Sequence, residues 1–208
     1  MFTKIKKISR IPTESELKKI PHTFFIIDEK QKKFPFQDLL EKKLKRIGKK
    51  IKDLKKNSVV TEHEGGGIIC WVMALETNNL FQCHTLLRKS MTTLIKEKPN
   101  SISIVCNVDK KLLKIWAEAA VYVTLLNTNK LPTHKKDKNI VLLKNLDLYG
   151  VSSSLDLKIV KATTIGNSLT RELTITPPNN LTPAIYREKI KKLEKKSNWK
   201  LQEFSMSK

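Results

Sequence analysis

The sequence predicts an α/β fold in which a mixed, mainly parallel sheet of five or six strands is covered by helices on both faces and followed by a C-terminal linker helix. Short apolar runs rich in β-branched and aromatic residues alternate with longer segments in which apolar residues recur every three or four positions. Strands that alternate with helices favour a parallel sheet with both faces buried. The 208 residues are enough for one sizeable domain.

Local patterns predict the elements of the first half. Thr13 and Glu16 have the spacing of a capping box, so a short helix should begin after Thr13. One helix is expected over 36–56, where lysines fill the faces left by five apolar residues at helical spacing, Leu40, Leu44, Ile47, Ile51 and Leu54. The other elements are strands over 2–8 and 22–27, and a hairpin of strands 58–61 and 67–73.

The second half continues the alternation. A helix is expected over 78–96, with Leu80, Leu87, Met91 and Leu94 on its buried side. A more uniformly apolar helix over 109–126 should be covered on most sides. The remaining elements are strands over 101–106 and 139–143, a helix from Thr182 to about residue 197, and the beginning of a further strand at Trp199 and Leu201–Phe204.

A single amphipathic helix that stops abruptly is expected between Leu155 and Pro183. Its predicted buried stripe consists of Leu155, Ile159, Ala162, Gly166, Leu169 and Leu173. Glycine lowers helix stability by about 1 kcal/mol relative to alanine, so we expect another backbone to approach closely at Gly166. Pro177 and Pro178 cannot continue a helix, and Thr182-Pro183 is a suitable start for the next one.

Two runs within this stretch resemble one family. Asn167-Ser168-Leu169-Thr170-Arg171-Glu172-Leu173 and Thr176-Pro177-Pro178-Asn179-Asn180-Leu181-Thr182-Pro183 are similar to the segment that joins the N-terminal and catalytic domains of the leucyl aminopeptidases. These enzymes are hexameric, two-metal exopeptidases that remove N-terminal residues from peptides. The alternative is an ordinary helix–loop–helix of an α/β protein, in which Asn167 and Arg171 would face solvent.

The resemblance implies a non-catalytic portion of such a metallopeptidase. Residues 1–150 would form an N-terminal α/β domain with a macro-domain-like fold, and residues 151–208 would be connecting helices leading towards an absent catalytic domain. In the family, a lysine and carboxylates of that catalytic domain hold two divalent metals, Zn or Mn, and no position of this chain matches them. We therefore expect no catalytic, cofactor-binding or metal-binding residue here. The expected role is architectural, with the catalytic domain and a homo-oligomer as partners.

Other polar clusters are interpreted as structural. Glu62-His63-Glu64 has no second His or Cys nearby in sequence, and adjacent residues point in different directions, so a metal site is not expected. Gly65-Gly66-Gly67 precedes a strand, which favours a hairpin turn over a phosphate-binding loop. Cys83 and His84 are helix neighbours that point about 100° apart, so they do not form a nucleophile–base pair. His84 should pack in the core, and His134 should lie in a loop.

The formal net charge of +21 leaves a second function class open. Residues 1–56 carry 18 basic and 7 acidic side chains. Lysine supplies nearly all of the positive charge, and lysines neutralise phosphates but read bases less well than arginines. A basic, non-specific nucleic-acid-binding module is therefore the alternative function. The explanation without a function is that the high lysine content reflects a biased genome. An ADP-ribose-type nucleotide site is least favoured, because no glycine-rich loop opens a helix.

Cysteine usage and hydropathy predict a cytoplasmic protein. Cys70, Cys83 and Cys106 are too few and too widely spaced for a disulfide framework, and Cys70 and Cys106 should be buried reduced thiols. The first residues lack the apolar core of a signal peptide. No run approaches the roughly 18 apolar residues of a membrane span, so no membrane partner is expected.

Overall fold

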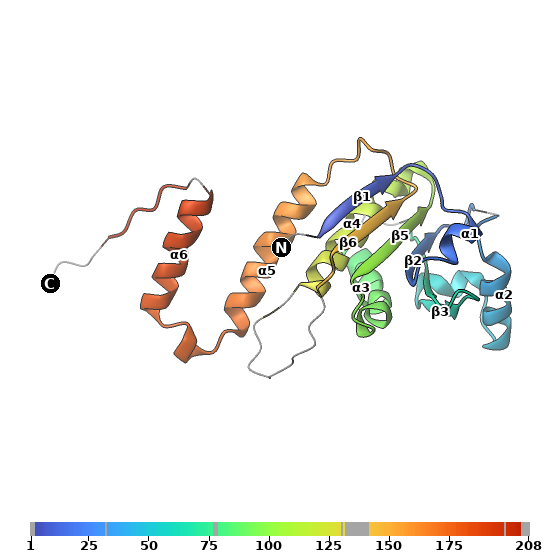
Figure 1. Cartoon of the computed structure of the whole chain (residues 1–208), viewed down its shortest axis with the longest axis horizontal. Coiled ribbons are helices and arrows are strands. Elements are labelled where there is room, and N and C mark those ends of the chain that lie inside the picture. The colour runs from blue at the N-terminus through green and yellow to red at the C-terminus, as the bar shows by residue number, and fades with distance from the viewer. Residues whose placement is uncertain are drawn as a thin grey trace.

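The computed structural model describes residues 3–31, 33–76, 79–129, 131, 142–197 and 199–204 (Figure 1). Its strands are β1 (Lys4–Ile8), β2 (His22–Ile27), β3 (Val59–Glu62), β4 (Ile68–Met73), β5 (Ser101–Asn107) and β6 (Asn145–Tyr149). Its α-helices are α1 (Glu14–Leu17), α2 (Gln37–Arg46), α3 (Leu80–Lys96), α4 (Lys110–Thr128), α5 (Lys158–Ile175) and α6 (Pro183–Ser197). Two short 3-10 helices are η1 (Ile51–Lys55) and η2 (Pro178–Asn180).

The six strands form one sheet in the order β1-β6-β5-β2-β4-β3. Every pairing is parallel except that of β3 with β4. The predicted mixed, mainly parallel sheet is therefore confirmed. The antiparallel pair is the predicted hairpin, whose turn is closed by a hydrogen bond from the Gly66 amide to the His63 carbonyl oxygen at 2.9 Å.

Each face of the sheet packs against its own helices, because alternate side chains of a strand point to opposite faces. On one face, Phe24 and Ile26 of β2 pack with residues of α3 and α4. On the other face, Phe25 and Ile27 pack with residues of α1, α2 and η1, and the Phe25 ring stacks on Trp71 with their centroids 4.7 Å apart. Residues 68–73 are buried throughout, as expected for a strand covered on both sides. The predicted covering of both faces is confirmed.

The helix predicted over 36–56 is wrong in its length. The α-helix ends at Arg46, and η1 follows after a turn at Gly48. Gly48 has φ = +65°, and the Lys49 amide donates to the Leu44 carbonyl oxygen at 2.9 Å while the Gly48 amide donates to that of Lys45 at 3.2 Å. This is the Schellman arrangement, in which a left-handed glycine ends a helix. Ile47, predicted to be buried, is consequently 40% exposed.

Gly48→Ala should lower the free energy of unfolding by about 1 kcal/mol, because alanine is strained at positive φ. Gly166→Ala is the matched control: Gly166 lies inside α5 with no atom within 4 Å of an added Cβ. There alanine should raise stability by roughly 0.5–1 kcal/mol. Urea unfolding of both variants measures the two effects, and changes of the same sign would contradict the assigned backbone roles.

Three further expectations differ from the described structure. Of the strand predicted over 139–143, residues 139–141 lie outside the described residues and 142–143 are not in a strand; the next described strand is β6. Residues 199–204 form no strand. Leu80, at the first position of α3, is 53% exposed rather than buried. The capping box of Thr13 and Glu16, in contrast, is present, and α6 begins at Pro183 as predicted.

Candidate functional site

A crevice of about 650 Å³ lies at the carboxyl ends of β2 and β4. The chain leaves β2 through α2 on one face of the sheet, and leaves β4 through α3 on the other face to reach β5. Such a reversal marks the place where open α/β sheets usually bind ligands. Charged lining residues are Asp28, Glu29, Lys30, Lys55 and Glu76. This crevice is therefore the candidate site by its place in the fold.

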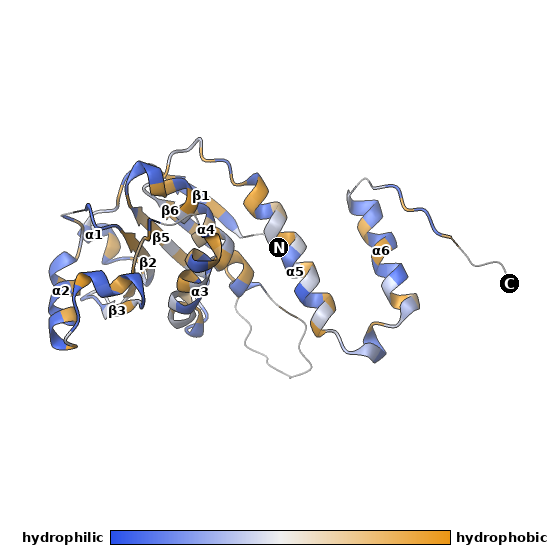
Figure 2. Ribbon diagram, turned by 180° about the vertical axis from the view of Figure 1, so that it is seen from behind, coloured by the Kyte–Doolittle hydropathy of each residue, from blue (hydrophilic) through white to orange (hydrophobic). Residues whose placement is uncertain are grey.

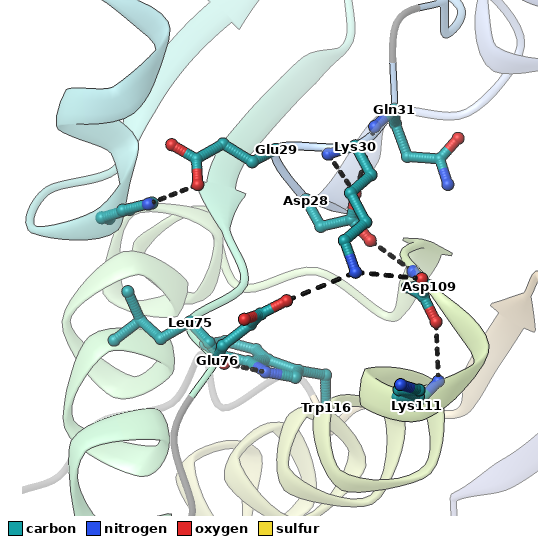
Figure 3. Close-up of polar contacts among 10 residues, drawn as sticks. Asp28, Glu29, Lys30, Gln31, Leu75, Glu76, Asp109, Lys111 and Trp116 are labelled. Carbon is teal, nitrogen blue, oxygen red and sulfur yellow. Dashed lines mark hydrogen bonds and ion pairs between the residues drawn. The ribbon is translucent and has the colours of Figure 1, made fainter.

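The Asp28 carboxylate accepts hydrogen bonds from backbone amides of two separate segments (Figure 3). Its side chain is buried, with 4% of the residue exposed. One oxygen accepts hydrogen bonds from the amides of Lys30 at 2.8 Å and Gln31 at 3.1 Å, and the other accepts one from the amide of Asp109. Asp28 thus ties the loop after β2 to the start of α4. Because these bonds occupy both oxygens, its role is positional.

The other carboxylates of the crevice are paired with lysines. Lys30 Nζ lies 3.4 Å from both Glu76 and Asp109, and Lys55 Nζ lies 2.7 Å from Glu29. The hydrogen bond from Lys30 to Asp109, with smaller effects from Glu76, raises the pKa of Lys30. These groups neutralise one another as charged pairs.

The start of α4 is unsuited to a phosphate. Asp109 caps this helix by accepting a hydrogen bond from the Lys111 amide at 3.0 Å. That bond, followed by the nearby Lys30, holds the pKa of Asp109 below its usual value, so its carboxylate is charged at neutral pH. A helix N-terminus normally attracts anions, but here a negative charge already occupies it. This geometry disfavours the nucleotide alternative.

The cluster around His63 does not converge on a ligand. His63 is 6% exposed, accepts a hydrogen bond from the Gly65 amide at 3.1 Å, and stacks on Phe36. Glu64 points outward to Lys18, with 2.8 Å between the charged atoms. Among the residues that the structure describes, no three His, Cys, Asp or Glu side chains gather in a way that could hold a metal ion.

Cys70, Cys106 and His84 show no sign of nucleophilic chemistry. Burial raises the pKa of Cys70 and of Cys106 to about 12, so both thiols are protonated at neutral pH. Burial lowers the pKa of His84, whose ring lies 4.9 Å from that of Tyr122 on α4. His84 is thus half-buried between α3 and α4 rather than fully in the core. His134 lies outside the described residues. Within the described ranges, no helix is both long and apolar enough to cross a membrane.

Asn167 and Arg171 attach α5 to α4. The Asn167 side-chain amide donates to the Tyr122 hydroxyl at 2.8 Å. The Arg171 guanidinium donates to the Leu126 carbonyl oxygen, near the C-terminus of α4, at 2.7 Å. A cation is favourable at this end of a helix because unpaired carbonyl groups concentrate negative charge there. The view of Asn167 and Arg171 as solvent-facing residues is therefore wrong.

The buried stripe predicted for α5 is also wrong. Val160 and Thr164 face the core, in line with Asn167 and Arg171. Ile159 is instead 80% exposed, Ala162 and Gly166 are exposed, and Leu169 and Leu173 are half-buried. No neighbouring backbone approaches Gly166. The apolar stripe lies on a different side of α5 from the residues that dock on α4, and we call its residues Ile159, Ala162, Gly166, Leu169 and Leu173 the outer face of α5.

Arg171→Ala should loosen the attachment of α5 to the domain. The substitution removes a charged hydrogen bond to Leu126, which contributes about 1.5–3 kcal/mol. Hydrogen exchange should therefore show faster exchange of α5 amides, with β2 and β5 unchanged. Thr170→Ala is the control, because the Thr170 side chain is exposed and its hydroxyl donates to the Gly166 carbonyl oxygen of the same helix. The backbone carbonyl oxygen of Thr170, which accepts from the Thr174 hydroxyl, is kept in this variant. Equal effects of the two substitutions would contradict the anchoring role.

Comparisons with known proteins show which solved structures share this fold. No family model matches the sequence, and a search of curated proteins finds no match. Solved structures do match. A mutant of tomato leucine aminopeptidase superposes with a TM-score of 0.65 at 16% identity, covering 94% of this chain and 43% of that one. This chain has the fold of the N-terminal region of leucine aminopeptidases.

Two further structures agree with this leucine-aminopeptidase fold. Cytosol aminopeptidase from Coxiella burnetii gives a TM-score of 0.56 at 13% identity, covering 93% of this chain and 38% of that one. The bottromycin maturation enzyme BotP in complex with Mn gives 0.58 at 11% identity, covering 86% and 37%. The chain thus spans well under half the length of each of these proteins. The division into residues 1–150 and 151–208 stays a prediction.

Proposed function

We propose that this chain is the non-catalytic N-terminal portion of a leucyl-aminopeptidase-like metallo-exopeptidase, in which it has an architectural role. The observation that supports this proposal most is that α5 has one side anchored to α4 and an apolar side that is partly exposed. Side chains of the resembling segment anchor one side of the helix to α4, and the outer face is exposed at Ile159, Ala162 and Gly166. Such an exposed apolar stripe favours contact with a further protein surface.

The partner of the outer face of α5 would be the catalytic domain. The solved structures that share this fold are more than twice as long as this chain, so a further domain has a place in the proposal. Residues near the end of α5 are already covered by α6, where Lys189 lies 3.0 Å from Glu172. The turns that begin at Ile159 remain free for contact, and Figure 2 shows hydrophobic residues spaced along this helix.

We also propose an oligomeric state and a cellular compartment for the whole protein. The whole protein would assemble as a hexamer in the cytoplasm and hold two divalent metals, Zn or Mn, in its catalytic domain. Three free, buried cysteines are consistent with a reducing compartment. In such enzymes one ion polarises the peptide carbonyl group and the pair activates a water molecule.

The test is hydrolysis of leucine p-nitroanilide by the purified chain with Mn²⁺ or Zn²⁺. We expect a rate equal to that of metal without protein, because the described residues offer no group of metal ligands. Tomato leucine aminopeptidase serves as the positive control. Metal-dependent hydrolysis by the 208 residues alone would overturn the proposal that this chain is non-catalytic.

A further inference from the structure

Positive charge is concentrated on one surface, formed by α2 and η1. Nine of the fifteen residues from 42 to 56 are Lys or Arg, whereas 41 of all 208 residues are. A genome that favours lysine everywhere does not explain a threefold local enrichment. We call the exposed members the basic surface; they are Lys42, Lys45, Arg46, Lys49, Lys50, Lys52 and Lys56.

These charges outnumber the acidic residues near them, which on α2 are Asp38 and Glu41. Asp53 is the single acidic residue between 42 and 56, and its side chain accepts a hydrogen bond from the Lys50 amide at 2.8 Å. Within the described residues, no side chain of the basic surface forms an ion pair. The basic helix α6 differs, because Arg187 and Lys191 pair with Glu203, and Lys189 pairs with Glu172.

The fold holds the charges close together. Leu40 and Leu44 anchor α2 to the sheet with 0% and 3% exposure, and Leu54 anchors η1 with 0%. Because Leu40, Leu44 and Leu54 belong to one buried cluster, α2 and η1 cover the same face of the sheet. Figure 1 shows α2 at the end of the molecule opposite α5. A straight helix over 36–56 would have spread the charges of residues 42–56 around its circumference and over about 21 Å.

We propose that the basic surface binds double-helical nucleic acid through its phosphates. A duplex carries one negative charge per about 1.7 Å of its axis, so a helix of ten residues, about 15 Å long, can meet several phosphates. Lysines are point charges that contact the backbone without reading bases, so binding is independent of sequence. No aromatic residue lies between 37 and 57, so the stacking contacts that hold single strands are not available there.

A membrane fits the basic surface less well. Amphipathic helices bind membranes by inserting an apolar face between lipids. The apolar face of α2 is already buried against the sheet through Leu40 and Leu44. Anionic lipid could therefore attract this surface only by charge, and vesicles provide the competing outcome of the test.

Binding is measured by fluorescence anisotropy with a labelled 20-base-pair DNA duplex of mixed sequence. We expect about four phosphate contacts, so affinity should fall roughly 100-fold between 50 and 200 mM KCl. Lys42→Glu/Lys45→Glu/Lys49→Glu should weaken binding at least tenfold at 50 mM and flatten the salt dependence. The same three lysines changed to Arg should retain binding, which separates lost charge from lost folding.

The matched control is Lys192→Glu/Lys195→Glu/Lys196→Glu on α6, which changes the net charge by the same amount. We expect its affinity to stay within threefold of the unaltered chain. Equal losses in the two triple variants, no binding of the unaltered chain at 50 mM, or binding to phosphatidylserine vesicles but not to duplex would each overturn the proposal. The basic surface lies at the end of the molecule opposite α5 and α6, so neither result bears on the aminopeptidase proposal (Figure 1).

Discussion

Asp28→Ala is expected to lower the free energy of unfolding by about 3 kcal/mol, a substantial part of the stability of a domain. The substitution deprives the amides of Lys30, Gln31 and Asp109 of their acceptor. It also separates the loop after β2 from the start of α4, which are 81 residues apart in sequence. Urea unfolding at pH 7 measures the change.

Two variants distinguish this positional role from a general effect of charge. Asp28→Asn keeps one acceptor oxygen and should lose less stability than Asp28→Ala. Glu29→Ala removes the adjacent carboxylate, whose partner Lys55 lies in an exposed pair, and should change stability by no more than about 0.5 kcal/mol. If Asp28→Ala were as mild as Glu29→Ala, the carboxylate would not be holding the loop.

Ile159→Glu/Ala162→Glu should leave the isolated chain as stable as before and disrupt its assembly with a catalytic partner. Both side chains are exposed on α5, so the thermal midpoint should move by no more than about 2 °C. If the outer face of α5 is buried in the whole protein, two carboxylates there would lie unpaired in an apolar contact, which costs several kcal/mol. Leucyl-amide hydrolysis that copurifies with the chain should fall at least tenfold.

Leu80→Glu/Phe81→Glu is the control for this prediction. These residues are 53% and 76% exposed in the first turn of α3, so the change in polarity and charge is similar but lies away from α5. We expect the copurifying activity to be retained. Loss of activity in both variants, or in neither, would contradict a specific role for the outer face of α5.

Much of the fold could be predicted from the sequence because its strands are short apolar runs bounded by polar residues. The strand over 22–27 and the helix after Thr13 have unambiguous local signals. The sequence does not indicate a strand over 145–149, because Asn145 and Asp147 interrupt the apolar pattern. Their places in β6 are set by parallel pairing with β1 and β5, which local reasoning does not see.

The site was harder to predict because its key contacts are long-range. Asp28 follows a strong strand signal, but nothing nearby in sequence shows that it receives the amide of Asp109. The outer face of α5 was predicted to be buried because apolar spacing identifies a stripe without identifying what covers it. The side of α5 that docks on α4 is instead formed by Val160, Thr164 and the polar Asn167 and Arg171. Helical spacing alone could not assign that role to an amide and a guanidinium.

The central claim is that this chain serves a leucyl-aminopeptidase-like enzyme without performing its chemistry. The direct measurement is to recover the native protein, from cells that make it, with an antibody against residues 1–150, and to assay Mn²⁺-dependent leucyl-amide hydrolysis. We predict that the recovered material is active and that the recombinant 208-residue chain is inactive under the same conditions. Inactive recovered material, or hydrolysis by the recombinant chain alone, would contradict the claim.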